Sequence, residues 1–367
     1  MKIATLGLVL VSCLLLGCST TPSSVTPAQP AVRSYNGTAS VGDFLTISIN
    51  STSLTITYKN YTNGETGTVP YTVNEDGTYT VTDPSGNLLA AYEVPGFVMM
   101  IETAKSGPKE DTPALITAIE SVPATINTFA GQDFNYLQFR TANGGTEIGT
   151  ITVDAQGNIT HDGFSPFEVF SGNPFSGASI PATGVQEDAS GAFFTITDSG
   201  GPDNYAFGTP SGFFAVDTGN GTILSLPKPA AKTFDASVAG SYTAIYYEKA
   251  DAQAGSGNVE TGTATEGKGN ITVSARGGVT ITDTEGNTLA TGTLSAVADT
   301  SYLYNGNSSE LSDPLYGMFT LRTTTANSRQ DVFVQFEGKA MIFSSFETKL
   351  PIAGYAPYNY FYGVALK

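Results

Sequence analysis

Apolar and polar residues alternate with a period of two along most of the chain. In the run 44–61, Leu45, Ile47 and Ile49 are separated by hydroxyl residues. This alternation is typical of antiparallel strands that bury one face. The polar residues 50–53 interrupt the run, so we expect a hairpin with its turn there.

For two further segments, the sequence allows more than one interpretation. Thr112 and Pro113 could cap and begin a helix over 113–122. The strand pattern on both sides favours a strand instead, hairpinned to 96–105. In the second segment, Phe213 and Phe214 predict the start of a buried strand rather than a site.

One hairpin pattern recurs three times. Each copy has an alternating strand, a turn with glycine and a second strand rich in threonine, and the copies span 67–87, 149–163 and 269–287. The equivalent glycines would supply the positive φ of a tight turn, and they are Gly77, Gly157 and Gly277. Asp83 and Asp283 open two near-identical turns that follow. Either the chain contains a degenerate repeat, or it reuses a hairpin that is common in all-β proteins.

These patterns predict an all-β chain of two or three tandem antiparallel domains, each a β-sandwich or a small β-barrel. A β-propeller is the alternative, because short strands with regular turns also fit one. Proline and composition set the expected boundaries, with 226–242 as a linker. The expected parts are a signal peptide 1–17, a tether 18–33, and β domains 34–125, 126–228 and 233–367.

The first residues have the pattern of an export signal. Lys2 is followed by an apolar run to Leu16, which is shorter than the roughly 20 residues of a membrane span. The quartet 15–18, Leu-Leu-Gly-Cys, resembles the lipobox of bacterial lipoproteins. That resemblance implies cleavage by signal peptidase II and lipid on Cys18, and the Ser19 that follows resembles the outer-membrane sorting pattern. The polar, proline-broken segment 19–32 then predicts a flexible tether.

The charge and the cysteine content exclude several classes of function. Removing the leader removes Lys2 and leaves 15 basic against 33 acidic residues, a formal charge of −18. That charge opposes nucleic-acid binding. Cys13 leaves with the leader and Cys18 is the expected lipid site, so the body has no thiol. Disulfides, cysteine nucleophiles and thiolate metal sites are therefore excluded, and we expect no cofactor.

Residues that carry chemistry are few. His161 beside Asp162 could act as an oriented base, but an exposed turn histidine is the simpler interpretation. The turn 74–77 gathers oxygen ligands but lacks the order of an EF-hand, so we expect no metal. A polysaccharide hydrolase needs two facing carboxylates, for which Glu93 and Asp203 are the first candidates, although both fit turn or edge positions.

The closing segment contains Tyr358, Tyr360 and Tyr362, which share one face if it is a strand. They predict either a ligand platform or a closing strand packed on both faces. The function expected from the sequence is a non-enzymatic binding or scaffolding lipoprotein of the cell envelope. It would be held in the bilayer, in the outer membrane, by acylated Cys18, with a polysaccharide or an envelope protein as its partner. The hydrolase, and a subunit of a surface assembly, are the alternatives.

Overall fold

A computed structural model shows a chain built almost entirely of β-strands. It describes residues 30–103, 114–140, 145–164, 175–197, 203–210, 212–228, 234–250, 264–296, 315, 317–325, 328–346 and 359–367. The helical elements in these ranges are three 3-10 turns, η1 (Ile126–Thr128), η2 (Ala182–Gly184) and η3 (Ala236–Val238). No helix among the described residues is long and apolar enough to cross a membrane. Ala31–Lys367 forms one compact unit, and the all-β prediction is confirmed.

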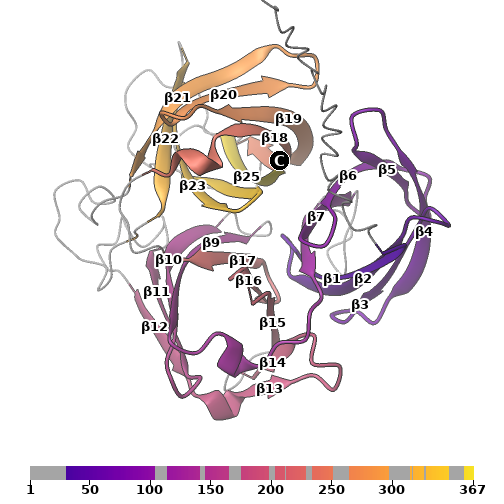
Figure 1. Cartoon of the computed structure of the whole chain (residues 1–367), viewed down its shortest axis with the longest axis vertical. Helices are drawn as coiled ribbons and strands as arrows, with labels where there is room; N and C mark the ends of the chain where they lie inside the picture. The colour runs from indigo at the N-terminus through magenta and orange to yellow at the C-terminus, as the bar shows by residue number, and fades with distance from the viewer. Residues whose placement is uncertain are drawn as a thin grey trace, which may run out of the picture. The chain divides into compact units, whose positions relative to one another are not determined.

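The first sheet is a closed eight-stranded barrel, drawn in indigo and purple (Figure 1). Each strand pairs antiparallel with the next, and β1 pairs with β8 to close the ring. The strands are β1 (Val32–Ala39), β2 (Asp43–Asn50), β3 (Thr55–Asn60), β4 (Thr66–Val73), β5 (Tyr79–Thr82), β6 (Leu88–Val94), β7 (Val98–Thr103) and β8 (Ala114–Glu120). The hairpin over 44–61 and the strand over 113–122, paired with β7, are confirmed. β1 begins at Val32, inside the range expected for the tether.

The second sheet is open and has nine strands in the order β12-β11-β10-β9-β17-β16-β15-β14-β13. It curls as a half-barrel in magenta and rose (Figure 1). Its strands are β9 (Gln132–Arg140), β10 (Gly145–Val153), β11 (Ile159–Phe164), β12 (Phe175–Ile180), β13 (Val185–Glu187), β14 (Phe194–Ile196), β15 (Asn204–Gly208), β16 (Phe214–Asp217) and β17 (Thr222–Pro227). Phe213 and Phe214 are buried where β16 begins, as expected.

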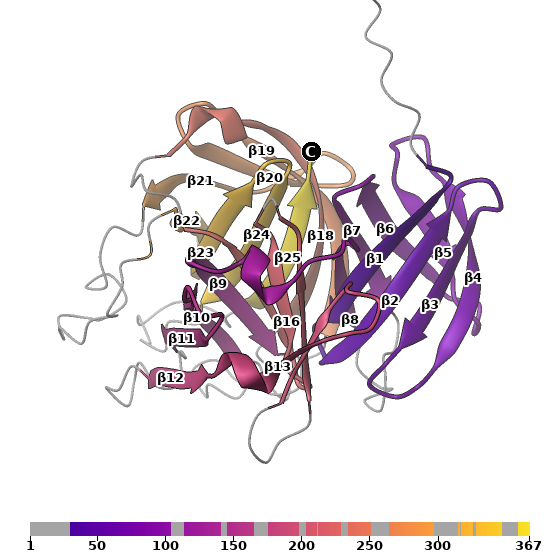
Figure 2. The same cartoon turned by 60° about the horizontal axis from the view of Figure 1, so that its bottom comes forward.

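The third sheet is again a closed eight-stranded barrel, in which β18 pairs with both β19 and β25 (Figure 2). Its strands are β18 (Gly240–Ala250), β19 (Ala264–Val273), β20 (Gly278–Asp283), β21 (Thr288–Ala296), β22 (Phe319–Thr325), β23 (Ser328–Glu337), β24 (Ala340–Phe346) and β25 (Asn359–Leu366). Closed barrels remove free strand edges, so the architecture is one of barrels rather than sandwiches or propeller blades.

The inward-facing residues of each sheet form its own apolar core. Ile47, Val69 and Met99 belong to the core of the first barrel. Phe134 and Phe214 belong to that of the second sheet. A further cluster takes residues from all three sheets, among them Phe44, Phe139 and Val364. The period-two pattern therefore serves two purposes: one face fills a barrel, and parts of the other join the sheets.

Three turns of the chain are structurally alike, although the sequence pattern grouped the one at Gly157 with Gly77 and Gly277 instead. Asp83, Asp154 and Asp283 each accept hydrogen bonds from the backbone and side-chain amides of the asparagine four residues later, at 2.7–2.9 Å. The glycine before each asparagine has a φ of 84–87°, a conformation that glycine adopts without steric cost. The hairpin lies at different places, however. It joins the fourth to sixth strands of the first barrel and the second to fourth of the third. The likeness is thus one of turns and not of whole barrels.

Candidate functional site

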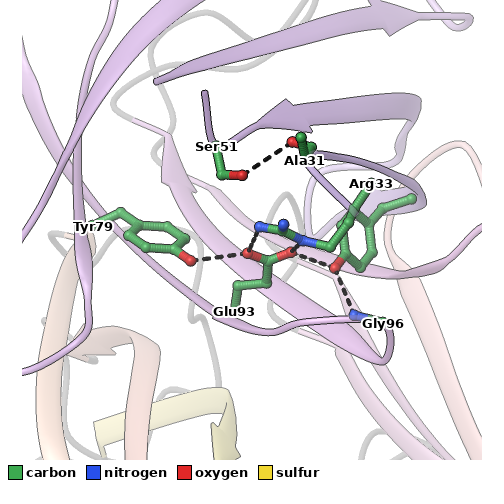
Figure 3. Close-up of polar contacts among 7 residues, drawn as sticks. Ala31, Arg33, Ser51, Tyr79, Glu93 and Gly96 are labelled. Atoms are coloured by element: carbon green, nitrogen blue, oxygen red, sulfur yellow. Dashed lines mark hydrogen bonds and ion pairs between the residues drawn. The ribbon is translucent and has the colours of Figure 1, made fainter. Parts of the chain in front are cut away.

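A buried polar cluster lies inside the first barrel, among residues that are otherwise apolar. It consists of Arg33 and Tyr35 from β1, Tyr79 from β5 and Glu93 from β6, and we call it the Arg33–Glu93 cluster. Figure 3 shows the Glu93 carboxylate between the Arg33 guanidinium and the Tyr79 hydroxyl. The Glu93 side chain has no exposed surface, and 9% of the Arg33 side chain is exposed.

Four donors of the chain satisfy the Glu93 carboxylate. Arg33 binds it through two bonds, from Nε to Oε1 at 2.6 Å and from Nη2 to Oε2 at 2.7 Å. The Tyr35 hydroxyl donates to Oε1, and the Tyr79 hydroxyl donates to Oε2 at 2.9 Å. The Tyr35 oxygen in turn accepts the backbone N–H of Gly96 at 3.2 Å. This bidentate geometry fits the planar guanidinium and stabilises a charge pair that burial would otherwise penalise.

Strand parity explains why these four side chains meet. Successive side chains of a strand point to opposite faces, so Arg33 and Tyr35 share the inner face of β1. On β6, Glu93 shares its face with buried Ala91, which is paired with Tyr79 of β5. The ring closure between β1 and β8 brings β1 back to the strands that follow β5.

The electrostatics of the cluster favour its present protonation state. The hydrogen bond to Glu93 raises the pKa of Arg33 above its ordinary value, so the guanidinium stays charged. Burial, with the hydrogen bond to Glu93, raises the pKa of Tyr35 above its ordinary value. Burial and the Glu93 charge do the same for the pKa of Tyr79. Both tyrosines therefore remain neutral donors at physiological pH.

This geometry opposes a catalytic role for Glu93. Both of its oxygens are occupied by donors of the chain, and its side chain is closed to solvent. Glu93 is also neither a turn residue nor an exposed edge residue, because it faces the interior of a barrel strand. The other candidate, Asp203, precedes β15, is exposed, and accepts the Thr197 hydroxyl at 3.0 Å. The structure thus gives both carboxylates local structural roles.

The tyrosines of the closing segment are only partly described. Tyr362 lies in β25 and is fully buried. Its ring stacks on Phe139 with centroids 4.5 Å apart, and its hydroxyl is 3.3 Å from that of Thr117. Tyr360 lies in the same strand, and Tyr358 lies outside the described residues. A ligand platform at Tyr358 and Tyr360 stays a prediction, whereas the Tyr362 ring is used in packing.

His161 differs from the sequence interpretation. It lies within strand β11 and not in a turn, and it is half-buried. Its ring approaches that of Tyr136 edge-on, with centroids 6.2 Å apart. The error came from Asp162 and Gly163, which suggested a turn although the strand continues through them.

The oxygen-rich turn 74–77 is occupied by a cation of the chain itself. The Asp76 carboxylate accepts the Thr78 backbone N–H at 2.9 Å and lies 2.8 Å from Lys268 Nζ. The hydrogen bond from Lys268 lowers the pKa of Asp76 to about 2. Among the described residues, no group of three or more histidine, cysteine, aspartate or glutamate side chains could hold a metal ion.

Sequence reasoning missed the Arg33–Glu93 cluster because it assigned Arg33 to the tether. A signal was present: Arg33, Tyr35, Gly37 and Ala39 continue one face of the first strand. Cys18, the expected lipid site, lies outside the described residues.

Comparison with known proteins finds distant structural likenesses, two transferrin binding proteins among them. No protein-family model matches the chain, and no curated protein matches it. A mutant of transferrin binding protein B from Haemophilus parasuis Hp5 aligns with a TM-score of 0.26 and 10% identity, over 92% of this chain and 76% of that one. The isotype 1 transferrin binding protein B of serogroup B Neisseria meningitidis aligns with a TM-score of 0.29 and 13% identity, over 89% and 65%. TM-scores of this size do not assign a fold family or a function to the chain.

Proposed function

We propose that the chain is a lipid-anchored envelope protein that binds or scaffolds a partner without catalysing a reaction. The observation that carries the proposal is the leader, an apolar run closed by Leu-Leu-Gly-Cys and followed by a polar tether. Acylated Cys18 holds the protein in the bilayer, and the β-sheet body lies outside the cytoplasm. The outer membrane is the proposed location, and an envelope protein or a polysaccharide is the proposed partner.

Two observations support a binding role over hydrolysis. Glu93, a candidate acid, is saturated by donors of the chain, and Asp203 bonds locally to a threonine. The closed barrels and packed apolar cores of the body suit a scaffold that presents a surface.

The anchoring is tested by metabolic labelling with a fatty-acid analogue. The leader offers a matched control, since it contains a second cysteine, Cys13, inside its apolar run. We expect label in the wild type and in Cys13→Ala, and none in Cys18→Ala. Protease treatment of whole cells then tests exposure. An unlabelled wild type contradicts the anchor, and a labelled protein that is fully shielded from protease contradicts an outward-facing role.

The binding role is tested on the body, residues 31–367, which forms one compact unit. Envelope polysaccharide is incubated with it, and both retention and newly released reducing ends are measured. We expect the body to retain the polysaccharide and to release no new reducing ends from it. Release of reducing ends that Asp203→Asn abolishes would favour the hydrolase.

A further inference from the structure

Exposed apolar side chains gather at one end of the first barrel. Five large apolar side chains stand out as exposed among the residues that the structure describes. Three of them belong to this end: Val32 at 52%, Leu54 at 40% and Val73 at 57% exposed. We call them the tether-side rim, because the tether joins the barrel at Ala31. Leu88, 71% exposed, follows the 83–87 turn at the opposite end.

The rim is continuous along the strand ends. Antiparallel pairing places the start of β1, the β2–β3 turn and the end of β4 at the same end of the barrel. The Ala31 carbonyl accepts the N–H of Ser51, in the β2–β3 turn, at 2.8 Å, and Figure 3 shows the Ser51 hydroxyl bond to the same carbonyl. The Leu54 carbonyl accepts the N–H of Tyr71, two residues before Val73 on β4, at 3.0 Å.

The backbone conformation of Leu54 is a second observation, independent of its exposure. It is the one non-glycine residue with positive φ in the described part of the chain, at 54°. The next turn has the same construction: Asn60 accepts two backbone N–H groups as Asn50 does, and Gly64 holds the matching place with a φ of 77°. A leucine in this conformation is a steric outlier. The chain thus places an exposed apolar side chain where glycine would be the unstrained choice.

The tether limits how far this rim can be from the bilayer. Twelve residues lie between Cys18 and Ala31, so thirteen Cα–Cα steps join them and allow at most about 45 Å of extended chain. A flexible chain of that length has a mean end-to-end distance of about 20 Å. Tethering therefore keeps the rim at a high effective concentration near the lipid surface. A few apolar side chains, too weak to hold a protein on a membrane alone, become sufficient for contact under that condition.

We infer that the tether-side rim rests on the lipid surface in which Cys18 is anchored, with Val32, Leu54 and Val73 dipping into the interface. This inference rests on the lipid anchor of the proposed function. The exposed Glu75 in the neighbouring turn favours neutral headgroups over anionic ones. The contact would set the orientation of the body, with Leu88 and its end of the barrel directed away from the bilayer.

The thiol-free body makes the test simple. Single cysteines are placed at Val73→Cys and, as the matched control, at Leu88→Cys, and each is labelled with an environment-sensitive nitrobenzoxadiazole probe. The lipidated protein is reconstituted into phosphatidylcholine vesicles, and reduction of the probe by dithionite is timed. The same labelled proteins without leader and lipid give the baseline in water.

We expect the probe at residue 73 to be reduced several-fold more slowly on vesicles than in water, with a blue-shifted emission, while the probe at residue 88 is unchanged. Adding Leu54→Ser should shorten the protection at residue 73 and leave vesicle binding intact. If the protein binds vesicles but dithionite reduces the probes at residues 73 and 88 equally fast, the rim does not contact the lipid surface. That result overturns this inference and leaves the lipid anchor intact. Failure of the lipidated protein to bind vesicles overturns the anchor as well.

Discussion

Replacing Glu93 by glutamine should destabilise the first barrel strongly, although the two side chains have nearly the same shape. Each carboxylate oxygen accepts one Arg33 N–H and one tyrosine hydroxyl. The glutamine amide nitrogen cannot accept, so one charged and one neutral donor lose their acceptor, and Arg33 loses the Glu93 charge with which it pairs. Removing one partner of a buried ion pair costs about 3–5 kcal/mol, and we take the lower end, about 3 kcal/mol, because Arg33 retains some exposure.

Hydrogen exchange followed by mass spectrometry suits this test, because the three sheets need not unfold in one step. A loss of about 3 kcal/mol corresponds to roughly hundredfold faster exchange in β1 and β6, whereas peptides of β22–β24 in the third barrel provide an internal control. The double variant of Glu93→Gln with Arg33→Met should recover at least about 1 kcal/mol, since it removes the buried charge that has lost the Glu93 carboxylate. The reasoning is refuted if glutamine changes exchange less than about twofold, or if the two substitutions are simply additive.

Three further changes test other features of the first barrel. Leu54→Gly should raise the free energy of unfolding by about 0.5–1 kcal/mol by relieving the left-handed backbone, and an unchanged urea midpoint would contradict the strain. Gly42→Ala should cost several times more than Gly64→Ala. Both glycines have positive φ, but a Cβ at residue 42 would lie 2.2 Å from backbone atoms of the β16–β17 turn, whereas nothing lies within 4 Å at residue 64; equal losses in a denaturation series would argue against that contact. Tyr35 and Tyr79 have raised pKa values, so the stability they contribute is complete below pH of about 10 and lost as pH rises through their folded-state pKa. An absorbance titration should show them ionising only with unfolding, and ionisation of every tyrosine near the ordinary value while folded would disprove it.

The sequence predicted strands well because burial of one face imposes the period of two. The hairpin over 44–61 and the β7–β8 pairing follow from that pattern and from local turn chemistry. The same alternation could have placed Arg33 and Tyr35 on the inner face of one strand. It could likewise have placed Ala91 and Glu93 on the inner face of another. Their pairing across 60 residues could not be predicted, because it depends on the register at which β1 closes against β8. Barrel closure is a property of the tilt and stagger of all strands together, which a local pattern does not contain.

The candidate site could be predicted from the sequence less well than the strands, for a related reason. The sequence offers 33 acidic residues, and nothing local distinguishes a carboxylate inside a barrel from one on a turn. His161 shows the converse error, since the Asp-Gly pair after it suggested a turn that the strand overrides. Residues whose role is set by their own turn, such as Asp83 and Asp283, were the ones interpreted correctly.

The open edges of the second sheet matter where copies of a protein are crowded together on a membrane surface. Lipoproteins confined to one leaflet meet each other far more often than freely diffusing proteins do, and exposed strand edges would invite them to pair edge to edge. Both barrels close their edges, and the second sheet ends in β12 and in β13, which is only three residues long. Under the proposed anchor, β13 thus offers a neighbouring copy few backbone groups, and the six-residue β12 is the longer of the two open edges.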